Sequence, residues 1–177
     1  MFHILLILSI LFVQSPQSTA EEQLQMIFDD HWEYSLQTNP IFATSQGDDR
    51  FNDQLPETGL DAMEENYEKS KEFLSRLHKI SREELSSESR INYDIFENQL
   101  EGSIWAYELN HHLLPLNGWW DYHASFATLG DDVPLETVED YDNYLSRLEE
   151  FPDYNGGYIE RMRKGIELGI MRPQDCF

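Results

Sequence analysis

Apolar side chains recur every three or four residues along most of this chain, the spacing that places them on one face of an α-helix. The first such run is expected to end at Asn39-Pro40, because the residue before a proline is steered away from helical angles. Two longer helices are predicted over residues 57–78 and 87–109. The apolar positions of these three helices are Leu24, Ile27, Phe28, Trp32, Leu36, Leu60, Met63, Tyr67, Leu74, Leu77, Ile91, Tyr93, Ile95, Phe96, Leu100, Ile104 and Trp105.

The C-terminal part carries two further helical patterns. Thr137 is expected to cap a helix that runs through residue 148. Phe151-Pro152 is expected to start a separate last helix, because proline is favoured in a first helical turn, and Gly156-Gly157 weakens its beginning. The apolar positions of the two patterns are Val138, Tyr141, Tyr144, Leu145 and Leu148, then Ile159, Met162 and Ile166.

The intervening stretches are polar or irregular. Residues 47–56 are typical of a loop, and Ser81 and Glu84 have the spacing of a capping box. Residues 110–136 are broken by prolines and glycines but rich in aromatic side chains. The sequence therefore predicts an all-α fold, an array of about five or six helices with an irregular aromatic-rich loop. Such an open array would leave an apolar face uncovered, so we expect it to be part of a larger helical fold.

The first twenty residues have the features of a secretory signal peptide. They carry no Lys, Arg, Asp or Glu, and residues 4–13 form an apolar run broken only by Ser9. Ser18 and Ala20 place small residues before a predicted break at Glu21, as a signal peptidase requires. The run is shorter than the about 20 apolar residues that a membrane-spanning helix needs.

This pattern predicts the domain organisation and the location. Residues 1–20 are assigned to the signal peptide and residues 21–177 to the helical N-terminal segment of a larger domain. The mature protein is then expected to be secreted or periplasmic, without stable membrane association after cleavage.

Charge and cysteine content narrow the function classes. The chain has 34 acidic against 12 Lys and Arg residues, a net charge of −22, which argues against nucleic acid and anionic lipid as partners. Residues 48–53 resemble a calcium loop but lack the required glycine and closing glutamate. The single cysteine, Cys176, excludes an internal disulfide.

Motifs for catalysis are missing from the sequence. No histidine is followed by glutamate, so the His-Glu-x-x-His helix of zinc peptidases is absent, as are a Gly-x-Ser-x-Gly elbow and a phosphate loop. The many paired carboxylates are interpreted as solvated helical faces. We therefore assign no catalytic, cofactor-binding or metal-binding residue in this chain.

The most unusual segment runs from Trp105 to Phe126. It allows two interpretations: a cleft wall that stacks on a substrate or peptide, or an aromatic layer packed beneath a loop. A metal site from its histidines is disfavoured, because adjacent side chains on a helix point about 100° apart. Its notable residues are Trp105, Tyr107, His111, His112, Trp119, Trp120, Asp121, Tyr122, His123 and Phe126.

Several short motifs, in order, resemble the start of the domain-of-unknown-function 885 family, exported proteins regarded as zinc-dependent peptidases. The tryptophan-rich stretch from Trp119 to Phe126 departs from the family pattern, so its role stays open. The matching stretches are Phe28-Asp-Asp-His-Trp32, Asn39-Pro-Ile-Phe-Ala-Thr44, Gly47-Asp-Asp-Arg-Phe-Asn-Asp53, Asn92-Tyr-Asp-Ile-Phe96, Leu114-Pro-Leu-Asn117, Thr137-Val-Glu-Asp-Tyr-Asp-Asn-Tyr-Leu-Ser-Arg-Leu148 with Phe151-Pro152, and Met162-Arg-Lys-Gly-Ile166 with Gly169 and Pro173.

The resemblance implies a long all-helical protein whose zinc helix lies downstream of the matched region. No zinc ligand can be carried over, and zinc and a peptide substrate are expected only for a full-length member. The leading hypothesis is thus a noncatalytic N-terminal portion that forms part of a substrate cleft wall, the coding sequence continuing beyond this chain or the product being shortened. The alternatives are a free-standing acidic helical binding protein with Trp119-Trp120 as contact surface, and an independent hydrolase that uses His111, His112 and His123.

Overall fold

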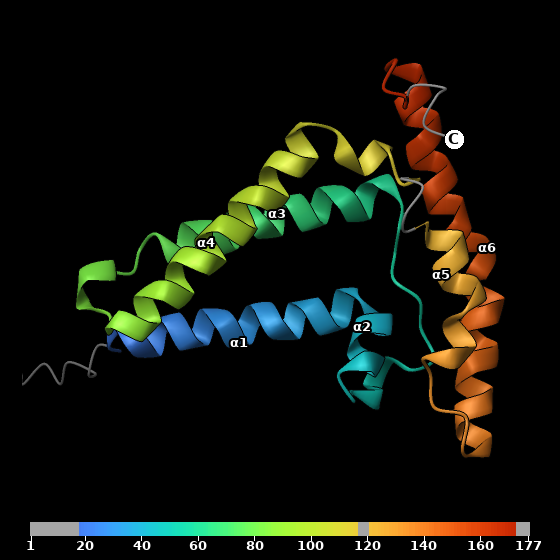
Figure 1. The fold of residues 1–177 in the computed structure, drawn as a ribbon, viewed down its shortest axis with the longest axis horizontal. Coiled ribbons are helices and arrows are strands. Elements are labelled where there is room, and N and C mark those ends of the chain that lie inside the picture. Colours follow the sequence, from blue (N-terminus) through green and yellow to red (C-terminus); the bar gives the residue numbers. More distant parts are fainter. Residues whose placement is uncertain (1–17, 117–120, 173–177) are drawn as a thin grey trace, which may run out of the picture.

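The computed structural model describes residues 18–116 and 121–172, and these residues contain helices and no strand (Figure 1). This confirms the predicted all-α array. Short 3₁₀ turns lie at Asp49–Phe51, Arg82–Glu84, His111–Leu113 and Leu129–Asp131. The α-helices are α1 (Ala20–Thr38), α2 (Pro40–Ser45), α3 (Leu60–Leu77), α4 (Ser87–Glu108), α5 (Tyr122–Ala127) and α6 (Val138–Glu167).

The helices form a wedge that is closed at one end. In Figure 1, α1 lies along one side and the paired helices α3 and α4 along the other, and the two sides meet near the start of α1. They diverge toward α6, which stands across the wide end with α5 against it. Helix α6 therefore borders the wide end of the wedge.

The hydrophobic core fills the closed end. His31 extends this core toward the wide end, where its ring meets Phe73 and Phe96 edge-on at 5.1 and 4.9 Å between centroids. Burial of these side chains from α1, α3, α4 and the turn between α3 and α4 supplies the main stabilisation of the wedge. The core residues are Leu24, Ile27, Phe73, Leu77, Ile80, Leu85, Tyr93, Phe96 and Leu100.

Helix caps fix where the elements begin. Thr19 and Glu22 form a capping box at α1, so the predicted signal break before Glu21 falls inside the first turn of this helix. Residues 1–17, which hold the rest of that segment, lie outside the described residues. The predicted capping box at Ser81 is wrong: its side chain makes no cap hydrogen bond, and Ser86 caps α4 instead.

The C-terminal region differs from the prediction of two helices. Helix α6 runs without a break through Pro152. An interior proline costs roughly 3 kcal/mol, mainly through one lost hydrogen bond and a ring clash. Buried Arg147, Tyr154 and Arg161 recur every seven residues on one face, on both sides of Pro152. Packing along that whole face outweighs the local cost, so the helix continues.

The segment predicted as irregular contains a helix. Helix α5 packs on α6 through two stacked ring pairs, Tyr122 on Tyr158 at 3.8 Å and Phe126 on Phe151 at 4.2 Å between centroids. The helix has only six residues, too few for a clear helical periodicity, and none of them is fully buried. Its position is set by contacts with α6.

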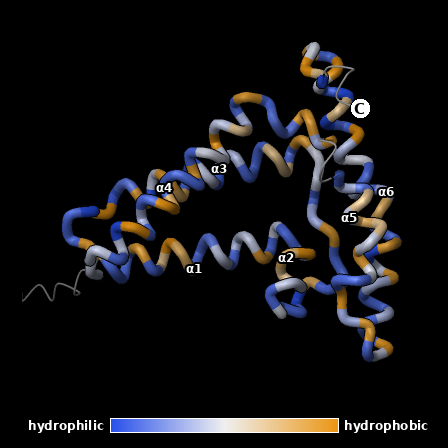
Figure 2. The backbone as a smooth tube through the Cα atoms, viewed as in Figure 1, coloured by the Kyte–Doolittle hydropathy of each residue, from blue (hydrophilic) through white to orange (hydrophobic). Residues whose placement is uncertain are grey.

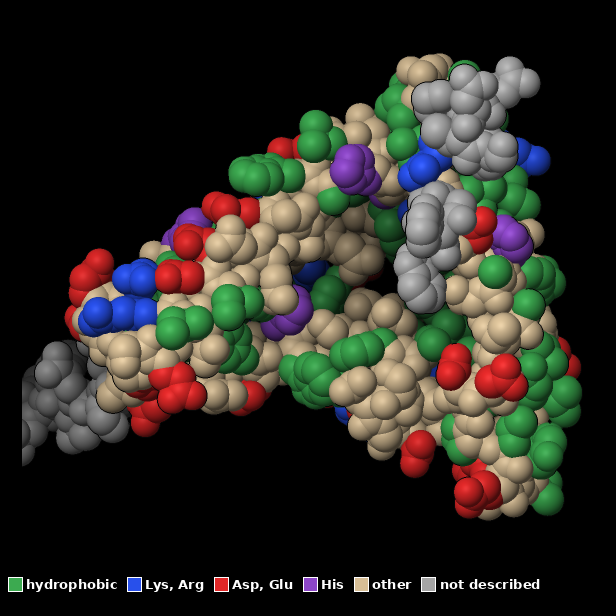
Figure 3. Space-filling model, viewed as in Figure 1, with side chains coloured by type: hydrophobic (Ala, Val, Ile, Leu, Met, Phe, Trp, Pro, Cys, Tyr) green, Lys and Arg blue, Asp and Glu red, His purple; other side chains and the backbone are tan. Residues whose placement is uncertain are grey.

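One side of α6 exposes apolar side chains three or four residues apart in two groups, which Pro152 and Asn155 separate. Val138, Tyr141, Leu145, Leu148 and Ile166 are between 38% and 79% exposed. Ile159 and Met162, half-buried, continue the same line. We call these seven residues the α6 stripe. Figure 2 marks hydrophobic positions along the backbone of α6, and Figure 3 shows hydrophobic side chains along this helix. None of the helices in the described part of the chain combines the length and hydropathy needed to cross a bilayer.

Candidate functional site

A cleft of about 470 Å³ lies at the wide end of the wedge. The side formed by α1 and α2 faces the side formed by α3 and α4, and Arg161 of α6 completes the lining. Figure 3 shows a hollow in this part of the surface. The residues that line the cleft are His31, Tyr34, Ser35, Thr38, Asn39, Phe42, Met63, Asn66, Tyr67, Ser70, Ser103, Ala106, Tyr107, His112 and Arg161.

The cleft differs in charge from the rest of this acidic protein. Its lining contains no Asp or Glu. A neighbouring cleft of about 400 Å³ shares Tyr34, Thr38 and Asn66 with it but is also lined by four acidic residues. Tyr34 donates a 2.6 Å hydrogen bond to Asn66 Oδ1 at the boundary. The boundary thus separates an acid-free cleft from an acidic one.

Arg161 is the one charged side chain of the acid-free cleft, and it is only 9% exposed. Its Nε donates to the backbone oxygen of His112 at 2.6 Å, and Nη1 donates to that of Thr58 at 3.4 Å. Its guanidinium also lies over the ring of Tyr158. Burial lowers the pKa of Arg161, yet a guanidinium stays charged in proteins. Within the described residues no carboxylate forms an ion pair with it.

Three stacked rings form one wall of the cleft. Tyr107 lies between Tyr67 and His112, with centroid distances of 4.4 and 4.3 Å. Burial lowers the pKa of His112, and the positive charge of Arg161 lowers it further. Burial also lowers the pKa of His31. Both imidazoles are therefore neutral at pH 7 and add no charge to the cleft.

The structure divides the aromatic segment that the sequence singled out. Tyr107 and His112 line the cleft, whereas Tyr122 and Phe126 belong to the layer packed on α6. Trp105, His111 and His123 are exposed, and Trp119 and Trp120 lie outside the described residues. Among the residues that the structure describes, no three His, Cys, Asp or Glu side chains are grouped closely enough to hold a metal ion.

A second buried arginine, Arg147, has a structural role. It donates to the backbone oxygens of Gln54, Phe51 and Pro40 at 2.8, 3.0 and 3.2 Å, and to Thr44 Oγ1 at 2.7 Å. These bonds tie α2 and the loop after it to α6. Arg147 therefore satisfies backbone acceptors away from the cleft, whereas Arg161 borders the cleft itself.

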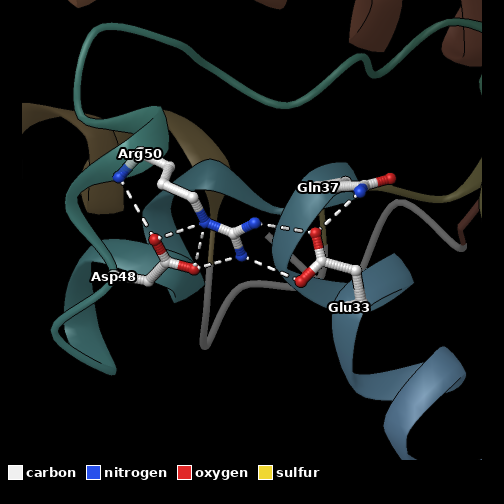
Figure 4. Close-up of polar contacts among 4 residues, drawn as sticks. All are labelled: Glu33, Gln37, Asp48 and Arg50. Carbon is white, nitrogen blue, oxygen red and sulfur yellow. Dashed lines mark hydrogen bonds and ion pairs between the residues drawn. The ribbon is translucent and has the colours of Figure 1, made fainter.

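Residues 48–53, which lack the full calcium-loop pattern, contribute Asp48 and Arg50 to a surface ion-pair network. Figure 4 shows Arg50 between Asp48 and Glu33, with hydrogen bonds of 2.6 to 3.0 Å to their carboxylates. Gln37 donates to Glu33 at 2.8 Å. The Arg50 side chain lowers the pKa of both carboxyl groups. The network joins α1 to the turn at residues 49–51.

Arg161 and His31 were not identified from the sequence. His31 is one histidine among six, and its place in the cleft depends on contacts between distant segments. Arg161 carried one detectable signal: it follows Arg147 and Tyr154 at intervals of seven, so the three share one face of α6. That spacing indicates a common face but does not reveal that the face is buried.

Comparison with known proteins assigns this chain to a family. The model of the family described as bacterial protein of unknown function (DUF885) matches residues 40–176, more than half of the chain. The chain belongs to this family. The match includes Tyr67, Tyr107 and Arg161 of the cleft but begins after His31 and the Phe28-Asp-Asp-His-Trp32 motif. No curated protein matches the chain.

Proposed function

We propose that this chain is the noncatalytic N-terminal portion of an exported zinc-dependent metallopeptidase-like protein. The observation that carries the proposal is the α6 stripe, which leaves most of one apolar line of a long helix exposed. Exposed apolar surface of this extent is typical of an interaction surface. Spacings of three and four residues are those of a helix–helix seam, so further helices of a larger fold suit this surface.

The acid-free cleft supports a role in substrate binding. Its volume lies within the roughly 300–1,000 Å³ of small-molecule sites, and its lining combines aromatic rings with a few polar groups. In the proposed full-length protein it forms part of the wall along which a peptide lies. The zinc ion and its ligands belong to the remainder of that protein, and the signal peptide supplies the export.

Metal content and activity test this proposal. The purified chain is expected to contain no stoichiometric zinc and to release no product from a mixed peptide library. Elemental analysis that finds one zinc per chain would contradict the proposal, and turnover abolished by a chelator would show that the chain itself is catalytic. Peptidase activity that survives chelation but is lost on replacing His111, His112 and His123 would support the independent hydrolase instead.

The continuous core at the closed end favours a second candidate, a free-standing acidic helical binding protein. Nine buried residues from three helices and the turn between α3 and α4 form this core, which suits independent folding. This alternative predicts one sharp calorimetric transition for the isolated chain and a partner recovered with it from the exported fraction. A broad transition together with strong binding of a hydrophobic dye would instead support the first proposal, in which the chain is one portion of a larger fold.

A further inference from the structure

We infer that the acid-free cleft binds the C-terminal carboxylate of a peptide, with Arg161 as its ionic partner. This inference rests on the proposed role of the cleft as part of a substrate wall and adds the class of substrate. The cleft is the larger of the two clefts that meet at the Tyr34–Asn66 hydrogen bond, and it is the one without acidic lining residues.

The first support is the unbalanced charge of Arg161. Buried charged side chains are normally paired, because removing an ion from water costs several kcal/mol. Arg161 is held by backbone oxygens of His112 and Thr58, which orient the guanidinium but do not neutralise it. A guanidinium presents five donors in a planar fork that matches a carboxylate. Arg147 also has no ion pair within the described residues, but it makes four hydrogen bonds to protein oxygens, whereas Arg161 makes two and borders the cleft. An anionic ligand in the cleft would therefore supply the missing counter-charge of Arg161.

The second support is the exclusion of acidic residues from the lining. The chain has a net charge of −22, so an approaching anion is repelled over most of the surface. Inside the cleft Arg161 is the one formal charge, because His31 and His112 are neutral at pH 7. The position that tolerates an anion is thus confined to the neighbourhood of Arg161.

The third support is the set of hydrogen-bond acceptors along the cleft. The hydroxyls of Ser35 and Ser70 donate to backbone oxygens of their own helices, at 2.8 Å in both cases. Their oxygens keep lone pairs that accept hydrogen bonds from a ligand. Amide N–H groups of a peptide suit these acceptors, whereas inorganic phosphate at neutral pH offers few donors. A peptide terminus therefore fits the cleft better than a free phosphate.

Binding to matched ligands tests the inference directly. Isothermal titration of the full chain should detect N-acetylated Ala-Phe with a free carboxylate, and the corresponding C-terminal amide should bind at least tenfold more weakly. Inorganic phosphate should not displace the dipeptide. Arg161→Lys, which keeps the charge but removes the fork, should reduce the preference for the acid over the amide.

A variant at an exposed position keeps the test independent of folding. Ser103 lines the cleft from an exposed position on α4, so Ser103→Trp should obstruct the cleft and weaken dipeptide binding at least tenfold. Ser87→Trp, at an exposed position in the first turn of the same helix, should leave binding unchanged.

The outcomes separate the inference from the proposed function. Equal affinity for acid and amide would overturn the role of Arg161 while the cleft-wall role stands. Failure of every peptide to bind would count against both. Displacement by phosphate would show a general anion site, and equal loss in both tryptophan variants would place binding elsewhere; either result would overturn the inference.

Discussion

At the scale of single residues, the two adjacent glycines of α6 differ in what surrounds them. A Cβ atom on Gly157 would lie 2.6 Å from the backbone nitrogen of Gly59 and would overlap Thr58. Thr58 is held there because its hydroxyl donates to the backbone oxygen of Tyr154 at 2.6 Å. We expect Gly157→Ala to lower the free energy of unfolding by about 1–3 kcal/mol, measured by urea titration, because the backbone must shift.

Gly156→Ala is the matched control. A Cβ at this position meets nothing within 4 Å. Replacing a helical glycine in open space should raise the free energy of unfolding by about 0.5–1 kcal/mol, since alanine loses less backbone entropy. Effects of the same sign in both variants would contradict the close approach of Thr58 and Gly59 to α6.

At the scale of elements, the N-terminus of α6 is held by a carboxylate whose protonation should weaken it. Asp140 accepts hydrogen bonds from the backbone N–H groups of Thr137 and Glu136, at 2.8 and 3.0 Å. The backbone hydrogen bond from Thr137, followed by that residue's side-chain hydrogen bond, lowers the pKa of Asp140. Its contribution is therefore present above the unfolded pKa of about 4 and is lost as pH falls through the lower folded pKa.

Asp140→Asn should consequently destabilise the protein at pH 7, and the difference from the parent should shrink in acid. Urea unfolding at pH 7 and near pH 3 measures it. Asp153→Asn, on the same helix but outside the cap, reports the effect of removing one negative charge. A difference for Asp140→Asn that persists unchanged in acid would show that the carboxylate does not hold the cap.

How much of these elements the sequence reveals depends on whether local signals agree with packing. The long helices α3 and α4 follow from periodicity, and the Thr137 cap follows from its side chain. Pro152 led to the wrong prediction of two separate helices, because its local penalty is outweighed by burial of α6 residues on both sides of it. The Ser81 box misled because its spacing also fits the 3₁₀ turn that forms there.

The candidate site was less accessible to sequence reasoning than the helices. Tyr107 and His112 were identified because they are close together in an aromatic segment. Arg161 belongs to a helix that is far from His31 in the sequence. Both residues line one cleft only because of how the helices are arranged in the wedge. Without a fold, nothing distinguishes Arg161 from an exposed helical arginine.

At the scale of the whole molecule, the α6 stripe should dominate the surface properties of the isolated chain. Leu145 and Ile166 are more than half exposed at two places on the stripe. We expect the parent chain to bind a hydrophobic fluorescent dye and to self-associate with rising concentration. The double variant Leu145→Gln with Ile166→Gln should lose most of both properties. Its free energy of unfolding should change by only about 0.5 kcal/mol per site, because little buried contact is removed.

Two exposed apolar residues outside α6 provide the control, because they match the exposure of Leu145 and Ile166 but lie on other parts of the surface. Met26 lies on α1 and Leu109 directly follows the last residue of α4, and both are about half exposed or more. Met26→Gln with Leu109→Gln should leave dye binding and self-association close to the parent, measured by fluorescence and sedimentation. Equal losses in the two double variants would mean that exposed apolar area in general, and not the α6 stripe, controls association. A parent chain that stays monomeric and dye-free would remove the main support for a covering partner on α6.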